Sequence, residues 1–151
     1  MKYFTIDEMC KSNTAKARKI DNTPTEEVKK NLQNLIEYIL DPLREKYGKP
    51  IIVSSGYRSD KLNRAVGGSK TSQHRFGQAA DIHAVVNSRK NNMEIFKLIK
   101  ECIDDWDQLI YEHGDNTGPD WIHISYSSKH NRKQILKAIS SSGRTKYINI
   151  K

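Results

Sequence analysis

Apolar residues recur at spacings of three and four between positions 28 and 43, which predicts an amphipathic helix with one buried face. We expect this face to belong to the hydrophobic core and assign it no function. Its members are Val28, Leu32, Leu35, Ile36, Ile39, Leu40 and Leu43.

The residues at both ends of this segment predict how the helix begins and where it is distorted. Thr23 is expected to cap the helix, with Pro24 at its first position and Glu26 completing a capping box. Pro42 lacks a backbone N–H, so we expect the helix to bend near Asp41.

Shorter apolar runs predict strands, and together with the helices they predict an α+β fold: a small antiparallel sheet with flanking helices in a single domain spanning residues 1–151. Residues 12–22 and 60–72 are expected to be polar connections. The expected strands are residues 51–54, 79–82, 108–112 and 121–125, with weaker apolar segments at 135–139 and 147–150, and the other expected helices are 6–11 and 88–103.

Composition restricts the kind of protein but does not identify its partner. Hydrophobic residues make up 36% and charged residues 29% of 151 residues, and no run approaches the roughly 18 apolar residues that span a bilayer. The N-terminal residues lack the pattern of a signal peptide, so we expect synthesis in the cytoplasm. The net charge of +8 favours polyanionic partners, but no nucleic-acid-binding motif accompanies it.

Two short segments contain most of the candidate chemistry, residues 72–83 and 118–125. His74, Asp81 and His123 provide two imidazoles and one carboxylate, which is the ligand set of many hydrolytic zinc sites with an open position for water. Asp120 lies three residues before His123, where a carboxylate would be placed to act as a general base. By spacing alone, these side chains are equally compatible with ordinary core and surface positions.

The pattern Ser72-x-His74-x-x-Gly77-x-Ala79-x-Asp81 resembles the S-x-H-x-x-G-x-A-x-D signature of the M15 family of zinc peptidases. That family contains D-alanyl-D-alanine carboxypeptidases and dipeptidases and phage L-alanyl-D-glutamate endopeptidases, and it shares its zinc arrangement with the Hedgehog amino-terminal domain. The resemblance extends over nearly the whole chain and is closest to the carboxypeptidase branch. Its other matching segments are residues 21–24, 40–44, 54–59, 63–68, 107–110 and 121–125.

The resemblance implies a Hedgehog-like zinc fold with His74, Asp81 and His123 as Zn²⁺ ligands. It implies that Asp120 is the general base, in the D/E-x-x-H pattern that ends at His123. It also implies that Arg58, in the segment Ser-Gly-Tyr-Arg-Ser, faces the scissile carbonyl and stabilises the oxyanion or holds a substrate carboxylate.

The chain departs from the family pattern at one catalytic position. Many relatives have a catalytic histidine two residues before the last ligand, where this chain has Trp121. Glu112 and His113, on the preceding strand, are therefore alternatives to Asp120 as the base. Three further residues are candidates for supporting a ligand or contacting substrate: Ser72, Gln108 and His83.

The resemblance implies a zinc-dependent peptidase that hydrolyses peptidoglycan stem peptides, as a D-Ala-D-Ala carboxypeptidase or as a cell-wall endopeptidase of the phage endolysin type. Such an enzyme would act at the bacterial cell wall, reaching it through a holin. We expect a peptide substrate, no nucleic-acid partner, no integral membrane segment and a monomer. Two alternatives stay open: a catalytically inactive zinc-binding interaction domain, and a basic nucleic-acid-binding domain.

Overall fold

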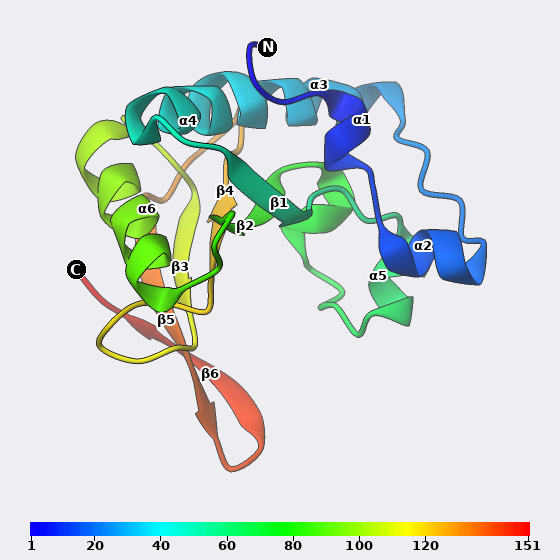
Figure 1. Ribbon diagram of the computed structural model, residues 1–151. Coiled ribbons are helices and arrows are strands. Elements are labelled where there is room, and N and C mark those ends of the chain that lie inside the picture. Colours follow the sequence, from blue (N-terminus) through cyan, green and yellow to red (C-terminus); the bar gives the residue numbers. More distant parts are fainter.

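Six strands form one sheet in the computed structural model, which describes residues 1–151 (Figure 1). The strand order is β1-β2-β4-β3-β5-β6, and every neighbouring pair is antiparallel except β3 with β5. The predicted α+β class is confirmed, although the sheet is larger than expected and contains one parallel pair. The strands are β1 (Ile51–Ser55), β2 (Ala79–Ala84), β3 (Gln108–Glu112), β4 (Trp121–Ser125), β5 (Gln134–Ser141) and β6 (Arg144–Asn149).

Helices precede the sheet in the chain and also connect its strands. Helix α6 packs against α4 and against β2 and β4. No helix combines the length and the apolar character that crossing a bilayer requires. The helical elements are α1 (Ile6–Met9), α2 (Asn13–Arg18), α3 (Glu26–Leu35), the π-helix η1 (Ile36–Leu40), α4 (Asp41–Tyr47), α5 (Asp60–Ala65), the 3-10 helix η2 (Gln73–Phe76) and α6 (Arg89–Cys102).

The long amphipathic helix forms as expected, but it begins two residues later than predicted. Thr25 caps it, with its hydroxyl accepting a hydrogen bond from the Val28 N–H. Thr23 instead donates from its N–H and its hydroxyl to the Asp21 carboxylate, which keeps it outside the helix. The predicted distortion near Pro42 takes the form of the π-helical segment η1, whose wider turns end at Leu40, two residues before this proline.

Two short helices occupy segments that we expected to be polar connections. A serine caps each of them: Ser12 accepts from Ala15 N–H in α2, and Ser59 accepts from Leu62 N–H in α5. Ala15 and Leu62 pack together with Ile20 in a small separate cluster. With so few apolar residues each, these helices lack the periodic pattern by which longer helices are recognised.

The two faces of the sheet have different roles. Ile82, Leu109 and Ile122 point to the helical side and belong to the main hydrophobic core. Because side chains alternate along a strand, their neighbours Asp81, Ile110 and His123 point to the opposite side. That opposite side of the sheet is the face on which the candidate chemistry lies.

Gly56, just after β1, is in close contact with the N-terminal segment. The backbone N–H of Tyr57 donates to the carbonyl oxygen of Met9, and a Cβ atom on Gly56 would lie 2.2 Å from that same oxygen. Since both groups are backbone, neither can move aside cheaply. Glycine at this position therefore joins the N-terminal segment to the sheet.

Gly56→Ala should lower the free energy of unfolding by about 2 kcal/mol or more, because the added methyl group forces the two backbones apart. Chemical denaturation monitored by circular dichroism measures this change. Ser140→Ala, at an exposed position in β5, is the control and should stay within about 0.5 kcal/mol of the wild type. Equal stability of Gly56→Ala and the wild type would contradict the contact.

Candidate functional site

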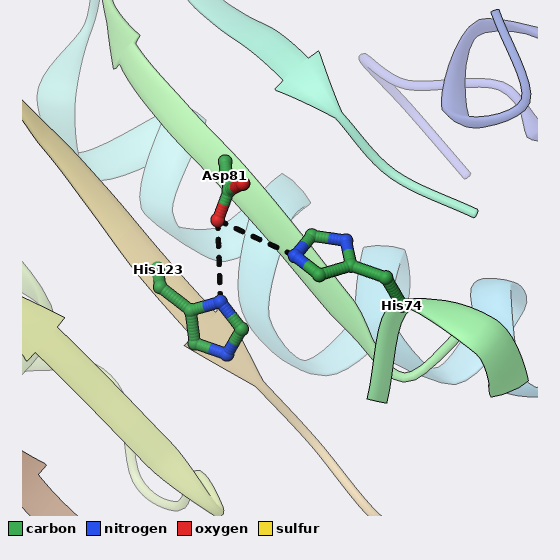
Figure 2. A group of neighbouring side chains, drawn as sticks. All are labelled: His74, Asp81 and His123. Atoms are coloured by element: carbon green, nitrogen blue, oxygen red, sulfur yellow. Dashed lines mark hydrogen bonds and ion pairs between the residues drawn. The ribbon is translucent and has the colours of Figure 1, made fainter. Parts of the chain in front are cut away.

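Three candidate ligands meet on the sheet face opposite the core. The Asp81 carboxylate lies between two imidazoles, with Oδ1 3.4 Å from Nε2 of His74 and 3.2 Å from Nδ1 of His123 (Figure 2). One ligand atom from each residue can be chosen so that all lie within 4.8 Å of one another. The structure thus brings together the three residues that the sequence motif predicted to hold the metal.

Strand register places two of these residues. Asp81 of β2 and His123 of β4 are direct partners across an antiparallel pair, so their side chains leave the sheet on the same face. His74 arrives from η2, which Ser72 caps by accepting from the His74 N–H. Gly77 then ends η2 with a φ of 72°, and a Cβ there would lie 2.8 Å from the Val28 carbonyl oxygen.

A backbone carbonyl fixes the orientation of the His74 ring. Nδ1 of His74 lies 2.7 Å from the Gly56 carbonyl oxygen, and the ring is buried. Only a protonated Nδ1 can donate to a carbonyl, so in the neutral ring Nε2 holds the lone pair that faces Asp81. In this tautomer Nε2 is free to bind a metal ion.

The charge state of Asp81 also suits a metal ligand. Burial alone would raise its pKa, but the neighbouring His74 and His123 rings outweigh burial and hold the pKa well below its usual range. The carboxyl group therefore stays ionised. Two imidazoles and one carboxylate match the donor set of hydrolytic zinc sites, and the residues present fit a Zn²⁺ ion.

The three residues line a cleft of about 970 Å³. Strands β3 and β4 form part of its wall, and the segment from Val66 to Gln73 forms another part. The hairpin of β5 and β6 contributes Leu136, Thr145 and Tyr147. A volume of this size accommodates an extended peptide of a few residues.

Arg58 lines the cleft beside the three residues, as the family pattern implied. Its Nη2 donates to the Ser72 hydroxyl at 3.3 Å, while its buried Nε has no hydrogen-bond partner in the protein. Burial lowers the pKa of this guanidinium, and the Asp81 carboxylate opposes that effect. Arg58 is thus a partly desolvated cation with a free donor next to the candidate metal centre.

The structure places the three candidates for the general base in different surroundings. Glu112 and His113 line the cleft, whereas Asp120 does not. The Asp120 carboxylate instead pairs with Nε of Arg89 at 2.9 Å. Asp120 precedes the first residue of β4, and neither its ion pair nor its position outside the cleft favours it as the base.

Glu112 has the properties that a base in this cleft needs. Its side chain is buried, and burial raises its pKa from 4.5 to about 7; the His123 ring opposes this shift and the Asp81 charge adds to it. His113, next in the chain, has a φ of 57° and lies against Trp121, with their ring centroids 5.5 Å apart. Trp121 therefore fills a wall position of the cleft.

The three tentative residues have different positions. Ser72 lines the cleft and contacts both His74 and Arg58. Gln108 also lines it and donates to the side chain of Gln134 at 2.9 Å. His83 shares the strand face of Asp81 but lies outside the cleft, with its Nδ1 2.6 Å from the Ala84 carbonyl oxygen.

Sequence reasoning missed the side of the cleft that Arg132 and the β5–β6 hairpin form. Arg132 is held by the buried Asp107 carboxylate, with Nε–Oδ1 and Nη2–Oδ2 distances of 2.8 and 3.0 Å, and Gln73 donates to the same carboxylate. Tyr147 lines the cleft from β6. It pairs with Ala138 of β5, which in turn pairs with Glu112 of β3, so the three residues lie in one row across the sheet. The weak apolar segments at 135–139 and 147–150 were the sequence signal for these strands, but not for their place in the cleft wall.

The His–Asp–His group lies in a cleft, in an arrangement that could hold a metal ion. A family model described as Peptidase M15 matches residues 2–125, and the chain belongs to this peptidase family. A search of curated proteins found no match. The matched range includes all three candidate ligands and ends at the last residue of β4, so β5 and β6 lie beyond it.

The raised pKa of Glu112 predicts how the stability of the metal-free protein depends on pH. Because the folded-state pKa of about 7 exceeds the ordinary 4.5, the stabilising contribution of the protonated group is complete below about pH 4.5 and is lost as the pH rises through 7. Between pH 4.5 and 8, the unfolding free energy of the wild type should fall by roughly 2 to 3 kcal/mol because of this group. Glu112→Gln should not show that fall.

Denaturant titrations of the metal-free proteins at several pH values measure this difference. Glu37→Gln, at an exposed position, is the control and should follow the wild type. Parallel pH profiles for the wild type and Glu112→Gln would show that burial does not raise the pKa of this carboxyl group.

Proposed function

We propose that the protein is a zinc-dependent peptidase that hydrolyses the stem peptides of bacterial peptidoglycan. The observation that carries the proposal is the His74, Asp81 and His123 cluster at the wall of a peptide-sized cleft, in a chain of the M15 peptidase family. The fixed His74 tautomer and the ionised Asp81 support zinc as the metal.

The chemistry divides between the metal and the side chains of the cleft. When bound, zinc supplies Lewis acidity for the scissile carbonyl and lowers the pKa of water towards about 7. Glu112 takes a proton from the attacking water and later delivers it to the leaving amine, a role that its buried position in the cleft supports. Arg58 stabilises the negative charge on the carbonyl oxygen, or binds a terminal carboxylate of the substrate.

Our assignment of the base differs from the one that the family pattern implied. Asp120 is paired with Arg89 outside the cleft, which supports Glu112 in its place. Glu112 also lies opposite Trp121 in the sheet register, so it is next to the position where many relatives have a catalytic histidine. The wall substrate, and the choice between a carboxypeptidase and an endolysin-type endopeptidase, follow from the family resemblance.

Digestion of purified peptidoglycan, analysed by mass spectrometry of the muropeptides, tests the proposal. The wild type should cut one type of peptide bond, and a chelator should abolish the cut. The mass of the released fragment distinguishes the loss of a terminal D-alanine from an internal cut. No cut in walls or in soluble muropeptides would contradict the proposal and favour an inactive zinc-binding domain.

Two matched variants test the base in the same assay. Glu112→Gln should lower the turnover rate by about 10²- to 10⁴-fold with zinc still bound, because it removes the proton acceptor. Asp120→Asn should retain activity within about tenfold, because it removes only a surface ion pair. The opposite ranking of the two variants would restore Asp120 as the base.

A further inference from the structure

The net charge of the protein is concentrated in residues 126–151. This segment contains seven lysines and arginines and no acidic residue, whereas residues 1–125 contain nineteen basic and eighteen acidic residues. The part matched by the family model is thus nearly neutral, and the segment beyond it has a charge of +7. Among the seven basic side chains, Arg132 alone forms an ion pair, with Asp107.

The strand register groups three of these cations on one face of the β5–β6 hairpin, which projects beyond the rest of the sheet (Figure 1). Lys146 is the partner of Ile139 and Arg144 is the partner of Ser141, so both share a face with Lys137. The other face bears Thr145 and Tyr147, which line the cleft. The hairpin therefore has a cleft side and a basic side, and we name Lys137, Arg144 and Lys146 the basic face.

Aromatic rings continue the basic face onto the helical side of the molecule. Nζ of Lys137 lies 5.0 Å from the centre of the Tyr111 ring, which packs edge-on against Phe96. Nζ of Lys100, on α6, lies 5.9 Å from the centre of the Phe96 ring. The two rings are buried, so their contribution is to hold the lysine side chains in place.

Unpaired cations gathered on one face repel one another, and a polyanion relieves that repulsion. We propose that the basic face binds a phosphodiester polymer of the bacterial envelope and so holds the cleft, on the other side of the same hairpin, close to wall peptide. The identity of the polymer rests on the proposed function. Nucleic acid is the weaker candidate, because the aromatic rings beneath the lysines are buried and offer no surface on which bases stack.

Co-sedimentation with Gram-positive cell walls that contain poly(glycerol phosphate) tests the proposal. All proteins include Glu112→Gln, which keeps the walls intact, so binding is measured separately from hydrolysis. The triple variant Lys137→Gln, Arg144→Gln, Lys146→Gln should raise the dissociation constant by about tenfold or more at 0.1 M salt. Stripping the polymer from the walls with hydrofluoric acid should weaken binding of the parent protein to a similar degree.

A control variant removes the same charge elsewhere: Lys16→Gln, Lys30→Gln and Lys46→Gln, at exposed positions in α2, α3 and α4 that form no ion pair. Its affinity for walls should stay within about twofold of the parent protein. Equal weakening in both variants would overturn the proposal, because net charge alone would then explain binding. Unchanged binding to stripped walls would also overturn it.

Duplex DNA and anionic lipid vesicles serve as competing probes. At equal phosphate concentration, both should bind more weakly than intact walls. If DNA or vesicles bind more tightly than intact walls, and the triple variant loses that binding, the proposal is overturned in favour of that partner. If wall binding follows the expected pattern but soluble muropeptides are not cut, the proposed function fails while the docking surface stands.

Discussion

The pairing of β2 with β4 is the constraint on which the site depends. It places Asp81 directly opposite His123, so that one carboxylate oxygen lies 3.2 Å from an imidazole nitrogen. A shift of this register by one residue would turn one of the two side chains into the core, because side chains alternate along a strand. The buried neighbours Ile82 and Ile122 prevent that shift, since it would expose them to water.

The third candidate ligand, His74, is held by backbone groups outside this strand pair. The Gly56 carbonyl fixes the His74 ring, and Gly56 itself packs against the Met9 carbonyl. The N-terminal segment therefore supports the site through one glycine, without contributing a functional side chain. The candidate metal centre thus depends on contacts between parts of the chain that are far apart in sequence: the N-terminal segment, the motif with His74 and Asp81, and the strand with His123.

How much of the fold and of the candidate site could be predicted depended on how far apart in the sequence the interacting residues lie. The grouping of the three candidate ligands was predictable because His74 and Asp81 lie in one short motif and His123 lies in a recognisable strand segment. The N-terminus of the long helix was placed at Thr23 rather than Thr25, because both threonines are plausible caps, and in the structure Thr23 bonds the Asp21 carboxylate while Thr25 caps the helix. The base was placed at Asp120 from its distance in sequence to His123, while strand alternation brings Glu112 into the cleft.

The β5–β6 hairpin shows the limit of sequence reasoning most clearly. Its apolar segments give only a weak strand signal in the sequence. Its parallel pairing with β3 is a long-range contact that no local sequence pattern predicts. Yet the hairpin forms one wall of the cleft and includes three of the seven basic residues of the segment 126–151. Charge was visible in the sequence, but its concentration on one side of a cleft wall was visible only in the fold.

The central claim is that His74, Asp81 and His123 form one metal site, and equilibrium zinc binding tests it most directly. Competition with a chelating dye should give about one tightly bound zinc ion per wild-type chain, and each alanine variant of the three should lose it. His83→Ala should bind zinc like the wild type, because His83 lies outside the cleft. Undiminished zinc binding by Asp81→Ala, or loss of zinc in His83→Ala, would contradict the account.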